Sequence, residues 1–284
     1  MATIIRGKEV AEHVLAQVKE DVAALAARGV TPCLAVILVG DDPASQVYVR
    51  KKKEKCAELG MRSLEFTLPA ETDETELLAL IGKLNADANV HGVLCQLPLP
   101  AHLDEQTIVR AVAPEKDVDG FTCRISADAK RDLMPCTPAG VMEMLQYAGI
   151  PIAGKQCVVV GRSNIVGKPM AMLLLQADGT VTVCHSKTKE LAAVTRTADI
   201  LIAAVGRPRF ITADMVKEGA VVIDVGVNRG ADKKLLGDVD FEAVEKKASH
   251  ITPVPGGVGV MTIAMLMKNT VRAAALQNPA KKDS

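Results

Sequence analysis

The sequence predicts an α/β protein with parallel sheets, and three observations support that prediction. Strand-like apolar segments alternate with helix-like segments throughout the 284 residues. Glycine, proline and N-cap residues separate these segments. A glycine-containing turn, Gly161 to Pro169, joins a bare apolar strand to a helical run, as in proteins that hold a pyrophosphate. The length suits one large or two ordinary domains, and an apolar content of 49% allows a sizeable core.

Helix and strand signals divide the first half of the chain into alternating elements. Asp42 is predicted as an N-cap with Pro43 at the first helical position. Gly29 and Gly60 each stop the helix that precedes them. The expected elements, in order, are a helix at 8–28, a strand at 34–39, a helix from 43 to just before 60, a strand near 64–68, a helix at 74–86 and a strand at 92–95.

The second half begins with an irregular stretch at 114–136, and such stretches in compact domains are often functional. Thr137 and Pro138 then begin a helix that ends at Gly149. The elements that follow are strands at 157–160, 180–184, 200–205 and 221–225 and helices at 170–176 and 261–276. We expect a cofactor-binding domain at 140–260 and a first domain formed by 1–139 together with 261–284.

The turn at Gly161 predicts a dinucleotide site through its context rather than its spacing. Ser163 stands where the pattern G-x-G-x-x-G has its second glycine, and Gly167 comes one place late. A strand precedes the turn, a helix follows it, and a second strand comes on schedule. Backbone N–H groups and the positive end of the helix dipole meet a pyrophosphate in such a turn. The alternative is an ordinary strand-to-helix turn without a ligand.

The residues after the second strand favour NADP over NAD. NAD sites usually have Asp or Glu there, but no carboxylate appears before Glu190. Ser186 and Lys187 offer a hydroxyl and a cation for a 2′-phosphate, and Arg162 can add a planar guanidinium. The alternative for Ser186 and Lys187 is a solvated loop end.

Composition argues against several classes of function. The 34 basic and 34 acidic residues cancel, and aromatic residues are scarce, which argues against a nucleic-acid partner. No apolar run approaches the ~18 residues of a membrane span, and charges interrupt any signal-peptide pattern. The scattered histidines predict no metal site. Seven cysteines without a C-x-x-C pair indicate reduced, buried thiols in the cytoplasm; they stand at 33, 56, 95, 123, 136, 157 and 184.

A basic run in the first half contains one lysine with a special position. Ser45, Tyr48 and Lys52 are three and four residues apart, which places them on one face of a helix. Lys51 and Lys53 point about 100° to either side, from the ~3.6-residue period. Lys52 is therefore the lysine of the run that is aligned with the tyrosine. The alternative is that the whole run, 50–53, is a solvated helix face.

Three loop segments carry further candidate residues. Gln96 follows a buried strand, where α/β sheets usually present their ligands. Asp117 and Asp119 lie in a polar turn, in which Asp119 can present its carboxylate to a ligand and Asp117 is also explained as an Asx-turn residue. The glycines of 253–259 allow close approach of the backbone to a flat ligand, or simply form a loop before the last helix.

Together these segments closely resemble one family, the bifunctional methylenetetrahydrofolate dehydrogenase/methenyltetrahydrofolate cyclohydrolases. The resemblance covers nearly the whole chain, and several motifs in the right order are far more specific than any one alone. Val260 is a departure, because the family usually has proline after Gly259. The matching segments are Pro43-Ala44-Ser45-Gln46-Val47-Tyr48-Val49 with Lys52, Gln96-Leu97-Pro98-Leu99-Pro100, Lys116-Asp117-Val118-Asp119-Gly120-Phe121, Pro135-Cys136-Thr137-Pro138, Gly161 to Pro169 and Pro253 to Gly259.

The resemblance implies roles for particular residues. The implied catalytic set is Lys52 with the glutamine that tunes it, Gln96, the pterin-binding Asp119 and Tyr48, which packs on the substrate. Further substrate contacts are implied for Ser45, Leu97, Pro255, Gly256 and Gly257. Cofactor contacts are implied for Gly161, Arg162, Ser163, Ile165, Val166, Gly167, Ser186 and Val227.

The resemblance also implies a fold and an activity. The fold is two α/β domains around a cleft, the second a Rossmann-like NADP-binding domain, in a cytoplasmic homodimer. The implied enzyme oxidises 5,10-methylenetetrahydrofolate with NADP and hydrolyses the product to 10-formyltetrahydrofolate, in one-carbon metabolism and purine biosynthesis, without metal, membrane or nucleic acid. Two alternatives are a monofunctional NAD(P)-dependent dehydrogenase, against which Lys52 argues, and a non-catalytic NADP-sensing scaffold.

Overall fold

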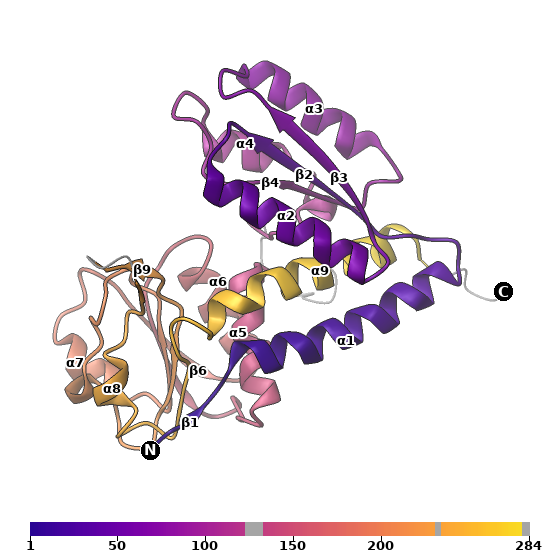
Figure 1. Cartoon of the computed structure of the whole chain (residues 1–284). Helices are drawn as coiled ribbons and strands as arrows, with labels where there is room; N and C mark the ends of the chain where they lie inside the picture. Colours follow the sequence, from indigo (N-terminus) through magenta and orange to yellow (C-terminus); the bar gives the residue numbers. More distant parts are fainter. Residues whose placement is uncertain (123–132, 231–233, 280–284) are drawn as a thin grey trace. The chain divides into compact units, whose positions relative to one another are not determined.

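The computed structural model of the chain describes residues 1–122, 133–230 and 234–279 and consists of two compact units (Figure 1). The three-stranded unit comprises Val14–Pro135 and Leu266–Ser284, and the six-stranded unit comprises Met1–His13 and Cys136–Met265. Each unit contains a parallel sheet with helices on it, which confirms the predicted α/β class. The division falls inside helices α1 (Gly7–Ala26) and α9 (Val258–Gln277).

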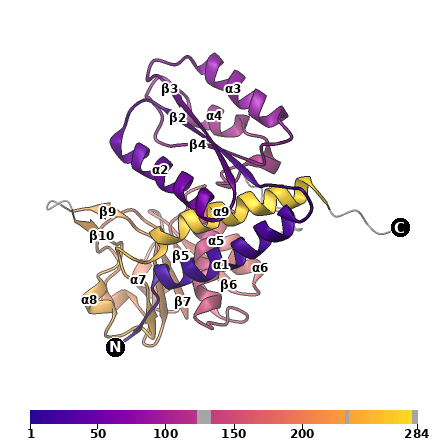
Figure 2. The same ribbon diagram turned by 45° about the vertical axis from the view of Figure 1, so that its right-hand side comes forward.

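The three-stranded unit is built around one buried strand. Strand β2 (Cys33–Val39) lies between β3 (Arg62–Leu68) and β4 (Gly92–Cys95) and pairs with both in parallel. All seven residues of β2 are buried, as expected for a central parallel strand covered on both faces. Alternate β2 side chains, from Cys33 to Val39, pack with Leu77 and Ile81 of α3 (Glu74–Ala86) and Ile108 of α4 (Glu105–Ala111). Helix α2 (Pro43–Glu58) packs on β2 and β3, on the other side of the sheet (Figure 2).

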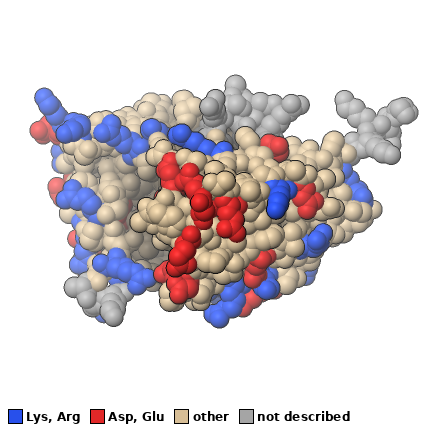
Figure 3. Space-filling model, turned by 90° about the horizontal axis from the view of Figure 1, so that it is seen from above, with Lys and Arg blue, Asp and Glu red and all other residues tan. Residues whose placement is uncertain are grey.

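Side-chain caps start the helices of this unit. The Asp42 carboxylate accepts a hydrogen bond from the Ser45 N–H at 2.8 Å, with Pro43 in the first turn, so the predicted cap is confirmed. Asp73 and Asp104 cap α3 and α4 in the same way, at 2.7 and 3.2 Å. The capping hydrogen bonds lower the pKa of Asp42 and Asp73, and the pKa of Asp104 is lowered first by the Thr107 hydroxyl and then by its capping bond. Figure 3 shows a group of acidic side chains that lie next to one another on the surface.

The six-stranded unit is a doubly wound sheet with the order β1-β11-β8-β7-β5-β6. From β5 (Gln156–Val160) the chain moves outward to β6 (Thr180–Cys184) and then returns to β7 (Ile200–Ala203), on the opposite side of β5. The sheet continues through β8 (Val221–Asp224) and β11 (His250–Ile251) to β1 (Thr3–Ile4). This reversal makes the carboxyl ends of β5 and β7 a topological switch point, where open α/β sheets bind their ligands.

Helices cover both faces of that sheet. Helices α5 (Cys136–Tyr147) and α6 (Gly167–Gln176) lie on one side, and α7 (Leu191–Thr195) and α8 (Phe241–Val244) lie on the other (Figures 1 and 2). Alternate residues of the central strands, Val158, Leu201 and Val222 among them, pack in one buried cluster with Leu191 and Val244. Full burial of each such aliphatic side chain contributes about 1.5–3 kcal/mol.

Several short elements were not predicted from the sequence. They are α4, α7, α8, β1, β11, the antiparallel pair β9 (Asn228–Arg229) and β10 (Leu235–Leu236), and the 3₁₀ turns η1 (Pro114–Lys116) and η2 (Ala213–Met215). Two-residue strands are too short to show an alternating pattern, and the helices among them span seven residues or fewer. The expected irregular stretch at 114–136 contains η1 and the first residue of α5, and its residues 123–132 lie outside the described part.

The cysteines that the structure describes are buried thiols, as predicted; Cys123 lies outside the described residues. Burial raises the pKa of Cys56 and Cys95 to about 12, which keeps both thiols protonated at neutral pH. Among the described helices none is both long and apolar enough to cross a membrane.

Candidate active site

Helix α2 buries the face that carries Lys52. The buried residues of the helix recur every three or four positions and are Ser45, Val49, Lys52 and Cys56. Lys52 is 9% exposed, whereas Lys51 and Lys53 on its flanks are exposed. The predicted alignment of Ser45 with Lys52 is therefore confirmed, and a uniformly solvated basic run is excluded for Lys52.

Tyr48 lies on the same side of α2 but is not buried with Ser45 and Lys52. Its side chain is 53% exposed, although Ser45 and Lys52 on the same helix are buried. At ~100° per residue, Tyr48 lies roughly 60° around the helix from Ser45, at the edge of the buried face. The ring is therefore available on the surface of α2, one turn before the lysine.

The Lys52 amine is joined to Gln96. Its Nζ donates a hydrogen bond to Gln96 Oε1 at 2.9 Å. The Gln96 amide nitrogen donates to the Leu97 carbonyl oxygen at 2.7 Å, which fixes the side-chain oxygen toward the lysine. The Gln96 N–H donates to Ile37 O of β2, so the residue is anchored at the carboxyl end of the sheet. Gln96 is predicted to carry function on the basis of that position, and Leu97 beside it is half-buried.

Residues 116–121 form a turn built by buried polar groups. Lys116 is 5% exposed, and its Nζ donates to Leu84 O and Asp87 O at the end of α3, at 3.0 and 2.7 Å. Asp117 accepts hydrogen bonds from Gly120 N and from the N–H and hydroxyl of Thr122. The interpretation of Asp117 as a turn residue is confirmed.

Asp119 projects from this turn near the end of β4 and is only half-buried. It lines a small cavity of about 10 Å³ together with Cys95 and Asp117, and the negative charges of Asp119 and Asp117 add to burial in raising the Cys95 pKa. Asn269 of α9, which was not predicted, donates to Val118 O and Met134 O at 2.9 and 2.7 Å and so fastens the turn. Its position in an apolar helix carried no local signal.

The glycine loop lies in the six-stranded unit. Gly256 has φ +101°, and a side chain at Gly257 would meet Pro253 O at 2.4 Å, so both positions require glycine. Gly7 N donates to Gly256 O at 2.8 Å and holds the loop against the start of α1. Helix α9 begins at Val258, earlier than predicted, so Val260 lies exposed in its first turn, where its N–H donates to Gly257 O at 3.2 Å. Pro255 and Gly256 are exposed and Gly257 is buried.

Two glycines explain the unusual spacing of the cofactor turn. Gly161 has φ +135°, and a Cβ on it would lie 2.1 Å from Ala204 O at the end of β7. A Cβ on Gly167 would lie 2.3 Å from Gly161 O, so the helix can start this close to the turn only with glycine there. The Val166 and Gly167 N–H groups donate to the Ser163 hydroxyl at 3.2 Å each. The turn therefore has, in place of the usual second glycine, a serine whose hydroxyl accepts from the N–H groups at the start of α6.

A pocket of about 470 Å³ opens at the switch point of the six-stranded sheet. Three predicted cofactor residues besides Ser163 line it: Gly161, Arg162 and Ser186. Arg207 and Phe210, from the loop after β7, also line it and were not predicted. No carboxylate is among the described residues of the lining, which suits a phosphate-bearing ligand. The pocket therefore fits the dinucleotide that the turn predicts.

The remaining predicted cofactor residues lie outside that lining. Ile165 and Val227 are exposed, Val166 is half-buried, and Gly167 is buried at the start of α6. Val227 is close to the glycine loop, because its Cγ2 would lie 4.0 Å from a Cβ on Gly259.

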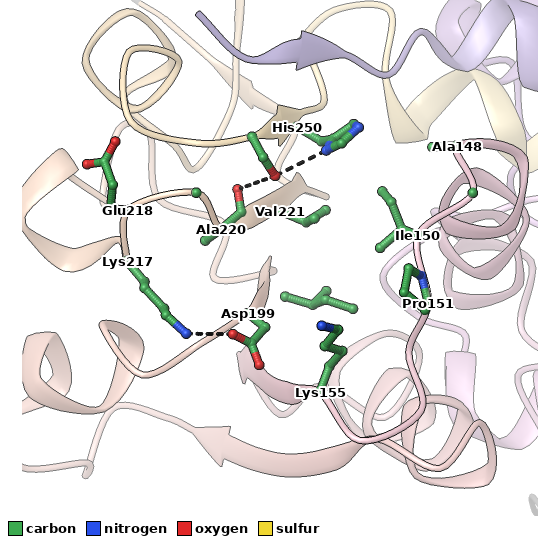
Figure 4. A pocket seen from close by; sticks show the side chains of 14 residues that line it. Ala148, Ile150, Pro151, Lys155, Asp199, Lys217, Glu218, Ala220, Val221 and His250 are labelled. Carbon is green, nitrogen blue, oxygen red and sulfur yellow. Dashed lines mark hydrogen bonds and ion pairs between the residues drawn. The ribbon is translucent and has the colours of Figure 1, made fainter.

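A second pocket, of about 340 Å³, lies at the opposite, amino ends of the strands (Figure 4). Two of its charged side chains pair with each other, because Lys217 Nζ donates to Asp199 Oδ1 at 2.6 Å. Asp199 also accepts from Gln156 N at 2.9 Å. Its position and internal pairing distinguish it from the pocket at the carboxyl ends, where α/β sheets bind ligands.

The doubly wound sheet, the phosphate-suited pocket and the buried lysine define a class, the dinucleotide-dependent α/β enzymes. The chain belongs to the tetrahydrofolate dehydrogenase/cyclohydrolase family. The model of the family's catalytic domain matches residues 5–119, and that of its NAD(P)-binding domain matches residues 135–278.

Relatives cover nearly the whole chain. It is 59% identical to the bifunctional protein FolD of Moorella thermoacetica, over 96% of this chain and 99% of that protein. The crystal structure of the bifunctional FolD dehydrogenase/cyclohydrolase of Campylobacter jejuni is similar with a TM-score of 0.91 at 49% identity, over 96% and 99%. The FolD of Trypanosoma brucei, solved with NADP cofactor and inhibitor, has a TM-score of 0.86 at 38% identity, over 96% and 97%.

Proposed function

We propose that this chain oxidises 5,10-methylenetetrahydrofolate to 5,10-methenyltetrahydrofolate with NADP⁺ and then hydrolyses the product to 10-formyltetrahydrofolate. The observation that carries the proposal is the hydrogen bond between buried Lys52 and Gln96. Hydride transfer needs no amine in a fixed position, whereas hydrolysis needs a group that transfers protons. Full-length similarity to bifunctional relatives supports both activities.

The first step needs positioning more than proton transfer. Bound NADP⁺ supplies the hydride acceptor, and the folate's own nitrogen lone pairs expel the hydride from its methylene carbon. The protein holds donor and acceptor in register, which lowers the barrier through orientation. The residues proposed for the cofactor are Gly161, Arg162, Ser163, Ile165, Val166, Gly167, Ser186 and Val227.

The second step moves protons and is assigned to Lys52. Water oxygen bonds to the methenyl carbon and loses both of its protons as the carbonyl forms. One proton is passed to N5 as the bond from this carbon to N5 breaks, and the other is released to solvent. An amine can accept a proton from the water and pass it to N5 only if part of it is neutral, against an ordinary lysine pKa of about 10.4. Lys52 is 9% exposed, and Gln96 Oε1 can accept a hydrogen bond from either form of the amine.

Folate contacts are proposed on four of the segments that the resemblance singled out. Asp119 accepts hydrogen bonds from the amino-pyrimidine edge of the pterin, and the exposed Tyr48 ring packs on the substrate. Ser45, Leu97, Pro255, Gly256 and Gly257 supply further contacts. In this proposal residues 1–139 and 261–284 form the folate-binding catalytic domain and 140–260 the NADP-binding domain.

We also propose a homodimer in the cytoplasm, where the enzyme serves one-carbon metabolism and purine biosynthesis. Strand β6 is the edge strand of its sheet, and Val183 on it is 39% exposed. Met172 and Leu175 of α6 add exposed apolar surface, at 40% and 55%. Burying this surface in a second copy is favourable, so Val183→Lys should convert a dimer into monomers in light scattering. A wild-type monomer at micromolar concentration would rule the dimer out.

One coupled assay tests the enzymatic proposal. Protein, methylenetetrahydrofolate and NADP⁺ are mixed, and the absorbance of the methenyl product is followed. A signal that rises and then decays faster than it does without protein supports both activities. Accumulation without accelerated decay indicates a dehydrogenase alone, and no signal contradicts the proposal.

A further inference from the structure

The loop after β7 brings a second arginine to the cofactor pocket. Arg207 lines the same pocket as Arg162 and Ser186. Within the described chain neither arginine forms an ion pair, whereas surface cations elsewhere, such as Lys217, have carboxylate partners. The pocket thus presents two guanidinium groups whose charges are not neutralised.

The Arg207 side chain has a defined position. Its guanidinium carbon lies 4.5 Å from the centroid of the Phe210 ring, a cation–π contact between two residues of the pocket lining. The contact lies in the exposed part of the loop, so the guanidinium stays accessible to a ligand. Arg209, two residues further on, is also exposed but is absent from the described lining.

The backbone beneath Arg207 is held by Asp238, a carboxylate with no exposed surface. Its Oδ2 accepts hydrogen bonds from Val205 N and Gly206 N at 2.6 and 2.9 Å, and its Oδ1 accepts from Arg207 N at 2.9 Å. Asn228 Nδ2 donates to the same Oδ1 at 2.9 Å. Three consecutive N–H groups converging on one carboxylate fix the conformation of the loop.

Asp238 is itself anchored by a second buried carboxylate. Asp224, at the end of β8, accepts hydrogen bonds from Asp238 N and Val239 N, both at 2.9 Å. The chain from Asp224 through Asp238 to the loop therefore connects the rigid end of a central strand to the pocket wall.

We propose that Arg207 is a specificity-determining residue that binds the 2′-phosphate of NADP together with Arg162 and Ser186, and that Asp238 is the residue that positions it. The inference rests on the proposed use of NADP. Ser186 follows β6, the place at which such folds read the ribose 2′-substituent. A dianionic phosphate beside Ser186 would meet the planar donors of both arginines, which is the geometry that guanidinium groups favour.

Two adenosine probes and one matched pair of variants test the assignment. Binding of adenosine 2′,5′-bisphosphate and of 5′-AMP is measured by calorimetry for wild type, Arg207→Gln and Arg209→Gln. Loss of one charged hydrogen bond typically costs about 10- to 100-fold in affinity. We expect Arg207→Gln to weaken the bisphosphate by that factor and 5′-AMP by less than threefold, and Arg209→Gln to change neither.

Each other outcome has a definite meaning. Equal weakening of both probes by Arg207→Gln would mean that Arg207 stacks on adenine or contacts the 5′-phosphate, and the assignment is then wrong. If Arg207→Gln keeps the wild-type preference for the bisphosphate over 5′-AMP, the assignment of Arg207 to the 2′-phosphate is also wrong. If the wild type does not prefer the bisphosphate over 5′-AMP, the proposed use of NADP is wrong, and the inference about Arg207 is then wrong as well.

A second variant tests the positioning role. Asp238→Asn replaces one acceptor with a donor that faces backbone N–H groups, so the loop should lose its conformation. In a folded Asp238→Asn protein we expect the preference for the bisphosphate to drop, and no further drop when Arg207→Gln is added. Additive losses in the double variant would show that Asp238 acts only on stability. If Asp238→Asn does not fold, Arg207→Gln alone decides the assignment.

Discussion

Lys52 and Gln96 are joined by a hydrogen bond of 2.9 Å between Nζ and Oε1, although 44 residues separate them in the sequence. The contact connects the buried face of α2 with the carboxyl end of β4. Because Gln96 is fixed by Leu97 O and by Ile37 O, it holds the amine in place rather than following it.

Gln96→Glu should shift the pH dependence of the hydrolytic step. A carboxylate at this position would stabilise the ammonium form of Lys52 and raise its pKa. Since the base is the neutral amine, the rising limb of the cyclohydrolase profile should move to higher pH, with a lower rate at pH 7. Gln46→Glu adds the same charge at an exposed position of α2 and should leave the profile unchanged. If the pH profile of cyclohydrolase activity does not shift in Gln96→Glu, Gln96 does not influence the proton transfer.

Asp119→Asn should weaken folate binding. The substitution keeps the size of the side chain but replaces one of two acceptors with a donor, which removes the paired hydrogen bonds proposed for the pterin. We expect about 10- to 100-fold weaker folate binding by calorimetry, with an unchanged circular dichroism spectrum. Glu115→Gln, an exposed carboxyl at the start of the same turn, is the control. Near-normal folate affinity in Asp119→Asn would show that Asp119 only shapes the turn and does not bind the pterin.

Gly161→Ala should disrupt the cofactor turn. The new Cβ would lie 2.1 Å from Ala204 O, and φ +135° is unfavourable for any L side chain. We expect a lower free energy of unfolding in urea and loss of NADP⁺ binding. Gly82→Ala, in α3 with open space around the Cβ, should instead raise the free energy of unfolding by about 0.5–1 kcal/mol. Unimpaired NADP⁺ binding by Gly161→Ala would contradict the account of this turn.

Asp224 should make stability depend on pH. Burial, with a contribution from the charge of Asp238, raises the pKa of Asp224 to about 6 from its ordinary 3.8, although three N–H donors oppose this rise. Between these values the folded state binds more protons than the unfolded state. The contribution of Asp224 to the free energy of unfolding therefore falls as the pH rises between them, by up to about 1.4 kcal/mol for each pH unit.

The comparison with Asp224→Asn isolates this effect, because the amide does not titrate. We expect the stability advantage of wild type over Asp224→Asn to be larger at pH 4.5 than at pH 7 in urea unfolding. An advantage that is constant across this range would show that the carboxyl pKa is not raised in the fold.

Features with local causes could be predicted from the sequence. Asp42 and Pro43 mark the start of α2 because capping acts over three residues, and the spacing of Ser45 and Lys52 indicates their shared face. The strand at 92–95 was predicted with its observed bounds, because its apolar run is bounded by turn residues.

Features that depend on tertiary contacts could not be predicted in this way. Asp238 serves a loop that lies about thirty residues earlier, so nothing beside it in the sequence indicates its role. Arg207 and Phe210 form a pair across a loop whose conformation depends on that carboxylate. Strands β1 and β11 extend a sheet that is already formed, β11 beside β8 and β1 at the edge, and do not depend on their own propensity.

The most direct test of the central claim measures both activities in Lys52→Met, Lys51→Met and Lys53→Met. Methionine keeps an unbranched apolar stem and removes the titrating amine. Lys52→Met should lose about 10²- to 10⁴-fold of its cyclohydrolase activity, the range for a lost general acid/base, and a smaller part of its dehydrogenase activity. The two exposed neighbours should retain both activities. Full cyclohydrolase activity in Lys52→Met, or equal damage in all three variants, would contradict the assignment of Lys52 as the group that transfers the proton.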